Sequence, residues 1–341
     1  MKSLIYLLLF IPAFSFAQDF KTYNNYDFVP GDTIVFEDHF TDDQNGEFPS
    51  HWNLGAGQGV MNMVGGQNSL LLTQGNFVHV SPLIKAPMYF ADAFTIEFDW
   101  YFNGSYGPHI YFYGNSKDAK AASSDMVNLS LDHSAASVIA GELLLDAPFP
   151  PEIQGEEHYK IWHHIAIAYK KNQMKIYVDQ NRILVVPNLG ISPHAFDIEG
   201  IGDENTPIVL TNFRVARGAG MNMLGKKFTD TKIITHGINF DIDKATIKPE
   251  SMGTLNMVMQ VMKDNPDVKF EVDGHTDNSG TKEHNLTLSQ QRADAVKAQL
   301  TKMGVDASRL TTKGFGDTKS IGDNNTLEGK ANNRRVEFVK K

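Results

Sequence analysis

The stretch GHTDNSGTKEHNLTLSQQR, residues 274–292, carries the densest set of side chains that could do chemistry. It contains His275, Asp277, His284 and Arg292 within nineteen residues. Imidazole, carboxylate and guanidinium groups at this spacing suit a catalytic site, a metal site, a structural ion pair or a clamp for a charged ligand. The surrounding sequence has to decide between these four.

Catalysis and metal binding find little support in the neighbouring residues. A nucleophilic triad needs a serine or cysteine beside a base, yet the chain has no cysteine and no Gly-x-Ser-x-Gly turn before a helix. A zinc site needs three or four converging ligands, and neither an HExxH motif nor a cysteine pair supports His275, Asp277 and His284 in that role. We therefore predict no catalytic residue, no metal and no cofactor.

The position of Arg292 in its helical pattern is more informative. A row with a spacing of four residues contains Leu288, Arg292, Val296 and Leu300. Its three apolar members predict the buried face of a helix, and Arg292 falls on the same face. A charge on an apolar face requires a partner. Asp277, in the loop before this helix, is the expected partner.

Two readings of the pair Asp277 and Arg292 are equally compatible with the spacing. The pair is either a structural salt bridge or a clamp for a zwitterionic amino-acid group. In the clamp, the aspartate takes the ammonium and the arginine grips the carboxylate through two hydrogen bonds.

The elements that must position this stretch alternate between strands and helices. Met252, Leu255, Met259 and Met262 form an apolar helical stripe that ends near Asn265-Pro266, and it reads as core. Residues 231–341 are thus predicted to form an α+β domain of order βαβαββ. Its predicted elements are a strand at 233–240, a helix from Pro249, a strand at 268–274, a helix at 286–303, and strands at 310–313 and 335–339.

The motifs FEVDGHTDNSG, HNLTLSQQRADAVKAQL, GFGD and ANNRRVEF together resemble the OmpA-like peptidoglycan-binding domain over residues 233–341. This resemblance implies that Asp277 and Arg292 hold the diaminopimelate side chain of the wall peptide. It also implies a non-enzymatic envelope protein that links peptidoglycan to an envelope partner. Further positions that match the family's pocket are Asn285 and Leu288 in its lining, Thr276 in its floor, and Asp241 at the end of the first strand.

Two positions depart from the family pattern. His284 stands where the family usually has tyrosine, and Lys330 where arginine often precedes the Asn-Arg-Arg run. Both departures bear on affinity more than on function. Arg334 and Arg335 read as structural, since adjacent residues on a strand point to opposite faces.

Residues 30–217 show strand periodicity. Phe94, Ile96, Phe98, Trp100 and Phe102 alternate with polar residues. Many short strands without long helical patterns fit a sandwich or a barrel, and charged pairs beside short, irregularly spaced strands favour a soluble sandwich.

The run WHHIAIAYKKNQMKIYVDQNRI, residues 162–183, resembles the laminin-G-like, concanavalin-type jelly roll. The segments IVFEDHF and FPSHW resemble the start of such domains in exported proteins of Gram-negative bacteria. The resemblance implies a jelly-roll sandwich, with Gln180 in place of the usual glycine. The glycine-rich and basic residues 218–230 are predicted to be a linker.

Two other functions of this N-terminal region stay open as alternatives. Glycoside hydrolases on this fold use ExDxxE; Glu97 and Asp99 begin that pattern, but Phe102 occupies the third acidic position. A glycan-binding lectin that uses calcium is suggested by Asp42-Asp43-Gln44-Asn45-Gly46-Glu47, which lacks full calcium-loop spacing. A glycan or an envelope protein is the expected ligand of this region.

The composition and the first residues of the chain limit its possible partners and its cellular location. The net charge is -9 with no dense Lys/Arg cluster, so nucleic acid is not an expected partner. Residues 1–17 predict a cleaved secretory signal, because their apolar run falls short of the roughly 20 residues that span a bilayer. The chain lacks the cysteine that would accept a lipid, and no later apolar segment approaches spanning length. We expect an exported periplasmic protein associated with the outer membrane and cell wall of a Gram-negative bacterium.

Overall fold

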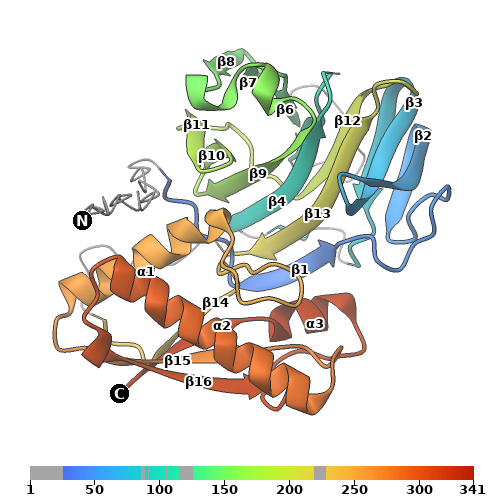
Figure 1. Ribbon diagram of the computed structural model, residues 1–341. Helices are drawn as coiled ribbons and strands as arrows, with labels where there is room; N and C mark the ends of the chain where they lie inside the picture. The colour runs from blue at the N-terminus through green and yellow to red at the C-terminus, as the bar shows by residue number, and fades with distance from the viewer. Residues whose placement is uncertain (1–25, 86–88, 91, 105, 115–125, 219–227) are drawn as a thin grey trace, which may run out of the picture.

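The computed structural model describes residues 26–85, 89–90, 92–104, 106–114, 126–218 and 228–341. The predicted signal segment 1–17 and residues 219–227 of the predicted linker lie outside this range. The described residues form a β-rich N-terminal region, hereafter the β-domain, and a C-terminal domain in which helices cover a sheet (Figure 1). None of the helices described here has the length and apolar character needed to cross a membrane.

The β-domain consists of thirteen strands joined by hydrogen bonds into one antiparallel sheet. Its main path runs β11-β10-β9-β4-β13-β3-β12-β5-β6-β7-β8, with β1 paired to β13 and β2 to β3. The strands are β1 (Thr33–Asp38), β2 (Trp52–Val64), β3 (Gln67–Pro82), β4 (Ala93–Phe102), β5 (His109–Tyr113), β6 (Met126–Leu131), β7 (Ala135–Ala140), β8 (Leu143–Pro148), β9 (Ile161–Lys170), β10 (Gln173–Val178), β11 (Asn181–Val186), β12 (Ala195–Gly202) and β13 (Ile208–Arg217).

This sheet is nearly closed, because β11 at one end of the path also contacts β8 at the other. The long strand β3 connects different parts of this sheet. It pairs with β13 through residues 70–72 and then with β12 through residues 75–80, so hydrogen bonding passes from one part of the sheet to the next. The all-β prediction for this region is confirmed, whereas the laminin-G-like jelly roll stays a prediction.

Strand β4 shows how the sequence pattern builds the core. Its predicted apolar face is confirmed, since Phe94, Ile96, Phe98, Trp100 and Phe102 are at most 4% exposed. Strands β9 and β10 form an antiparallel hairpin. Its turn residues Lys171 and Asn172 both have positive φ, which matches the right-handed twist of the strands.

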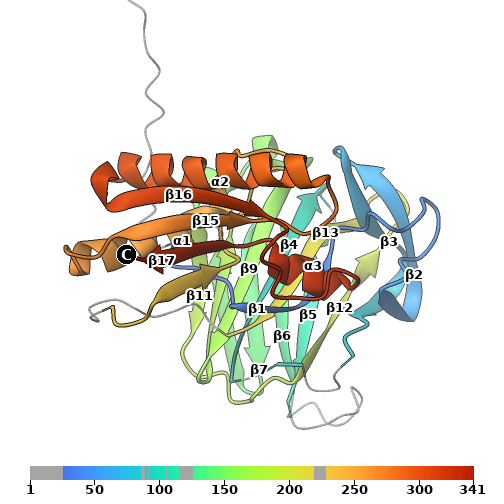
Figure 2. The same ribbon diagram turned by 90° about the horizontal axis from the view of Figure 1, so that it is seen from below.

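The C-terminal domain has a four-stranded sheet in the order β14-β17-β15-β16, in which β15 and β16 are parallel and the other pairs antiparallel. Figure 2 shows α2 lying along one side of β15 and β16. The elements are β14 (Lys232–Thr235), α1 (Met252–Asp264), β15 (Phe270–His275), α2 (Lys282–Lys302), β16 (Leu310–Gly316), α3 (Leu327–Asn333) and β17 (Val336–Lys340). Short 3₁₀ turns are η2 (Pro151–Ile153), η3 (Glu156–His158), η4 (Pro249–Ser251) and η5 (Ala307–Arg309).

Prediction and structure differ in several places here, three of which have a clear local cause. The first strand ends at Thr235, because the chain leaves the sheet for a loop that closes through a bridge between Phe240 and Ile247. Helix α2 begins four residues earlier than predicted, where the Thr281 hydroxyl accepts a hydrogen bond from the His284 amide at 3.2 Å. The order βαβαββ also omitted α3, a helix of seven residues capped by Thr326.

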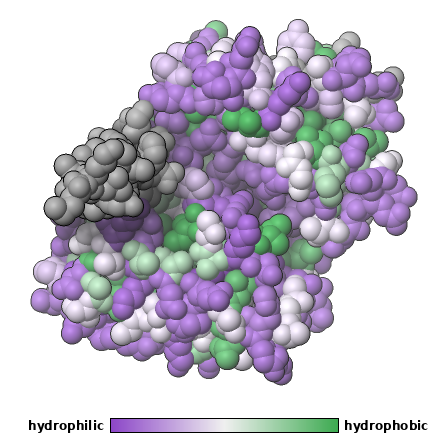
Figure 3. Space-filling model, viewed as in Figure 1, coloured by the Kyte–Doolittle hydropathy of each residue, from purple (hydrophilic) through white to green (hydrophobic). Residues whose placement is uncertain are grey.

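The two domains meet along β1 and α3, which lie side by side (Figure 1). The side-chain amide of Asn332, at the end of α3, donates through Nδ2 to the Ile34 carbonyl at 2.9 Å and accepts at Oδ1 from the Ile34 N–H at 3.0 Å. It therefore pairs with β1 as the backbone of a neighbouring strand would. Figure 3 shows a largely hydrophilic face with apolar patches near this junction.

Candidate functional site

Asp277 lies just beyond the end of β15, beside the end of the parallel strand β16. The Thr276 N–H donates to the Gly316 carbonyl at 3.0 Å, which ties the two strand ends together. The Asp277 carboxylate accepts from the Ser279 N–H at 2.9 Å and from Arg334 Nη1. Burial raises the pKa of Asp277, but the Ser279 N–H and the Arg334 guanidinium outweigh it and lower the pKa below its usual value. The group is therefore a carboxylate at neutral pH.

Asp277 was predicted to pair with Arg292, and this prediction is wrong. Arg292 Nε donates to the Lys244 carbonyl at 2.9 Å and Nη2 to the Asp241 carbonyl at 3.4 Å, while its Cζ lies 5.0 Å from the centroid of the Phe240 ring. The loop after Phe240 thus supplies the partners that this charge requires, through carbonyl groups that no sequence pattern reveals.

The two charges still lie close enough to affect each other. Burial lowers the pKa of Arg292, and the nearby Arg334 guanidinium lowers it further, while Asp243 and Asp277 act in the opposite direction. Arg292 is half-buried on α2, in the row that buries Leu288, Val296 and Leu300.

The remaining predicted site residues lie around this pair. Asn285 is buried and donates to the carbonyls of Asp277 at 3.1 Å and Gly280 at 3.2 Å, which holds the loop before α2. Thr276 is buried, and its hydroxyl has no hydrogen-bond partner among the described residues. Leu288 is 8% exposed, and the Asp241 carboxylate, 39% exposed, lies 3.8 Å from Lys244 Nζ.

Arg334 is the site residue that the sequence reading missed. It was predicted to be structural together with Arg335, and that holds for Arg335, whose side chain is 2% exposed and bonded to Glu337 at 2.7 Å. The Arg334 side chain is 33% exposed and reaches both Asp277 and Glu37. The prediction rested on strand alternation, but Arg334 caps the end of α3 and Arg335 also precedes β17, so that rule does not apply to either residue.

The histidines of this stretch do not converge on Asp277. His275 is 5% exposed and stacks on Phe315, whereas His284 Nε2 lies 2.5 Å from Asp243. These positions give no support to a shared metal site.

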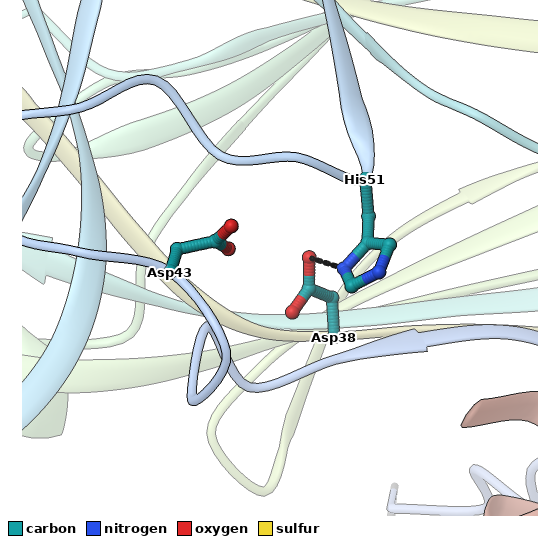
Figure 4. Close-up of side chains that lie close together, drawn as sticks. All are labelled: Asp38, Asp43 and His51. Atoms are coloured by element: carbon teal, nitrogen blue, oxygen red, sulfur yellow. Dashed lines mark ion pairs between the residues drawn. The ribbon is translucent and has the colours of Figure 1, made fainter. Parts of the chain in front are cut away.

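A second group of polar side chains, Asp38, Asp43 and His51, offers three possible metal ligands within 4.8 Å of one another (Figure 4). Both oxygens of Asp38 already accept hydrogen bonds, from the Phe40 N–H at 2.7 Å and from Trp52 Nε1 at 3.0 Å. Asp43 likewise accepts from Ser50, so the group closes the loop between β1 and β2. An imidazole is not the oxygen ligand that calcium prefers.

The acidic residues considered for a glycosidase lie under the C-terminal domain. Glu97 is 3% exposed and Asp99 is 9% exposed, and both contact His164, at 3.5 Å and 2.8 Å. Lys248 lies close enough to help lower the pKa of Asp99, after His164 and Asn212 have offset the effect of burial. The predicted polar face of β4 is therefore covered rather than open to a polysaccharide.

The family of the C-terminal domain follows from its sequence. Residues 239–334 match the model of the OmpA family. The C-terminal domain is an OmpA-like domain.

Relatives of the OmpA-like domain come from several bacteria. It is 42% identical over 123 residues to the probable lipoprotein YiaD of Escherichia coli, a match of 36% of this chain and 56% of that protein. It is 40% identical over 102 residues to the peptidoglycan-binding protein ArfA of Mycobacterium bovis, covering 30% of this chain and 31% of that protein. The peptidoglycan-associated lipoprotein of Burkholderia pseudomallei matches with a TM-score of 0.30 and 27% identity over 34% of this chain and 94% of that structure.

Proposed function

We propose that the OmpA-like domain binds peptidoglycan through the diaminopimelate of its stem peptide. The side-chain end of diaminopimelate carries an ammonium and a carboxylate on one carbon. Asp277 takes the ammonium and Arg292 takes the carboxylate, each through charge-assisted hydrogen bonds. The family match and the name of the Mycobacterium bovis relative support peptidoglycan as the ligand.

The observation that carries this proposal is the hydrogen-bonding capacity left on both charges. A carboxylate offers about four lone-pair sites and a guanidinium five N–H donors. Asp277 accepts from Ser279 and Arg334, and Arg292 donates to the carbonyls of Lys244 and Asp241. Each group thus keeps free positions for a ligand.

The domain acts in the envelope as a non-enzymatic anchor. We propose that the chain is exported to the periplasm of a Gram-negative bacterium, holds the wall through the OmpA-like domain, and reaches a glycan or a protein of the outer membrane through the β-domain. Relatives named as outer membrane proteins in Pseudomonas and Bordetella support this location.

The test is binding of the purified full-length protein to cell-wall sacculi. We expect binding to sacculi with diaminopimelate, and at least about tenfold weaker binding to sacculi with lysine, since lysine lacks the carboxylate that Arg292 grips. Equal binding to both kinds of sacculi contradicts the role of diaminopimelate, and no binding to either contradicts the function.

Variants locate the site on the domain. Asp277→Asn and Arg292→Lys should each weaken binding about tenfold or more, because each removes one charge-assisted contact or its geometry. Asp294→Asn is the matched control, since it removes an exposed carboxylate of α2 that contacts Gln290 and Thr312.

A further inference from the structure

One guanidinium joins the candidate wall site to the β-domain. Arg334 Nη1 donates to Asp277 in the OmpA-like domain, and Arg334 Nη2 donates to Glu37 in strand β1. The Glu37 side chain is 2% exposed, so this contact lies inside the molecule. A residue of one domain thereby fixes a charge that touches the binding carboxylate of the other.

A second arginine holds Glu37 from the other side. Arg214 Nε and Nη2 lie 2.8 Å and 2.7 Å from the Glu37 carboxylate. Arg214 Nη1 then donates to the His236 carbonyl at 3.2 Å and to Asn239 Oδ1 at 3.0 Å, both in the OmpA-like domain. Burial opposes ionisation, but Arg334 and Arg214 hold the pKa of Glu37 well below its usual range.

The backbone around Glu37 is also fixed. Asn332, two residues before Arg334, pairs with both polar backbone groups of Ile34, three residues before Glu37. The buried side chains of Ile34, Ala216 and Ala331 pack together beside this contact. The distance between Glu37 and Arg334 is therefore set by the docking of the two domains and not by a flexible side chain alone.

Asp277 and Glu37 supply two negative charges to this cluster, and Arg334 and Arg214 supply two positive ones. His39 Nε2 also lies 3.4 Å from the Glu37 carboxylate; burial lowers the pKa of His39, but this carboxylate outweighs it and raises the pKa above its usual value. Without Glu37, both guanidiniums lose a shared buried counter-ion, and Arg334 keeps Asp277 as its carboxylate partner. The ammonium of a ligand must then compete with an uncompensated guanidinium for Asp277.

We propose that Glu37 is a positioning residue of the wall site: by sharing Arg334 with Asp277, it leaves Asp277 able to accept a ligand ammonium, so that ligand affinity depends on docking of the β-domain. This inference rests on the proposed function, because it concerns the same site. It adds a residue from a different domain, 240 positions earlier in the chain than Asp277.

The experiment is a double-mutant cycle on binding of meso-diaminopimelate to the full-length protein, measured by calorimetry well below the unfolding midpoint of each variant. Glu37→Gln should weaken binding about tenfold. In an Arg334→Gln background, Glu37→Gln should change affinity less than about twofold, because Glu37 acts through Arg334. Glu37→Asp, which keeps the charge, should restore part of the affinity lost in Glu37→Gln.

A purely structural role of Glu37 gives a different result. Glu97→Gln is the matched control: it also removes a nearly fully buried carboxylate near the domain junction. Glu97 pairs with His164 and lies opposite Arg214 on the neighbouring strand, so this variant disturbs the surroundings of Arg214 while Glu37 stays in place. If Glu37→Gln lowers the unfolding midpoint as Glu97→Gln does and binds like the wild type, Glu37 is an interface ion pair and the inference is wrong. Equal losses with and without Arg334 also overturn it.

The outcome for the wild type separates the two proposals. If wild-type protein binds neither meso-diaminopimelate nor sacculi, both the proposed function and the role of Glu37 are wrong. If wild-type protein binds and Glu37→Gln binds equally well, the function stands and the role of Glu37 fails.

Discussion

The rings of His275 and Phe315 stack with nearly parallel planes, with ring centroids 5.2 Å apart and ring planes at 5°. Neither ring nitrogen of His275 has a hydrogen-bond partner among the described residues, and Nε2 lies 3.8 Å from the Glu337 carboxylate. Burial first, and then the Arg335 guanidinium, lower the pKa of His275 to about 4. This histidine is the last residue of β15 and precedes the candidate site residues Thr276 and Asp277.

The lowered pKa of His275 predicts that this residue makes the folded protein less stable as the pH decreases. In the unfolded chain the imidazole takes up a proton below a pKa of about 6.5, whereas in the folded protein it does so below about 4. Because the unfolded state binds more protons at this site between these values, the His275 contribution to the free energy of unfolding should decrease as pH falls from about 6.5 towards 4. The pKa of Asp273, raised by burial to about 6, acts in the opposite direction and is common to the wild type and a His275 variant. Urea unfolding at several pH values measures this slope.

His275→Gln isolates the contribution of this group. The variant should show a shallower pH dependence than the wild type between about pH 5 and 6.5, above the range in which most carboxylates titrate. His236 is also buried with a lowered pKa, and its contribution is common to both proteins. Identical slopes for the two proteins would show that His275 takes up its proton equally in the folded and the unfolded state, and that its pKa is not lowered by folding.

Removal of the Asp277 carboxylate should lower the free energy of unfolding by a moderate amount. The residue is 7% exposed, and its partner Arg334 keeps a second carboxylate in Glu37. We expect Asp277→Ala to lower the free energy of unfolding by about 1 to 3 kcal/mol, less than the loss when a buried charge has no other partner. Chemical denaturation gives the value. A loss above about 4 kcal/mol would mean that Arg334 depends on Asp277 alone.

Much of the OmpA-like domain was predictable from its sequence. Two helices that pack on a sheet are predicted by the stripe of Leu255 and Met262 and by the row of Leu288 and Val296. All four side chains are buried, as expected. The short helix α3 was missed, because seven residues contain too few turns for a periodic pattern.

The contacts of charged residues were harder to predict. Arg292 was placed on the right helix face, yet its partners are backbone carbonyls of a loop about fifty residues earlier in the chain. Glu97 and Asp99 follow the pattern of an exposed strand face, but docking of the second domain buries them. Strand periodicity reports which residues share a face and not what covers it.

A last prediction concerns Gly253 in the first turn of α1, where the N-terminal segment crosses the helix. A Cβ atom at this position would lie 1.8 Å from the Phe28 carbonyl oxygen, a distance that requires the backbone to move. Nearby, the Tyr26 hydroxyl donates to the Glu250 carbonyl at 3.2 Å, and Phe28 packs against Tyr177 of β10, so this segment lies between the two domains.

Gly253→Ala should therefore destabilise the protein although alanine favours helices. Helix propensity alone would add about 0.5 to 1 kcal/mol of stability, whereas overpacking typically costs about 1 to 3 kcal/mol. We expect a net lower unfolding midpoint and, if docking sets the wall site, weaker binding of meso-diaminopimelate. Lys263→Ala, at an exposed position of the same helix, should leave both unchanged. An equal or higher midpoint for Gly253→Ala would show that the segment around Phe28 can move away from α1 without cost.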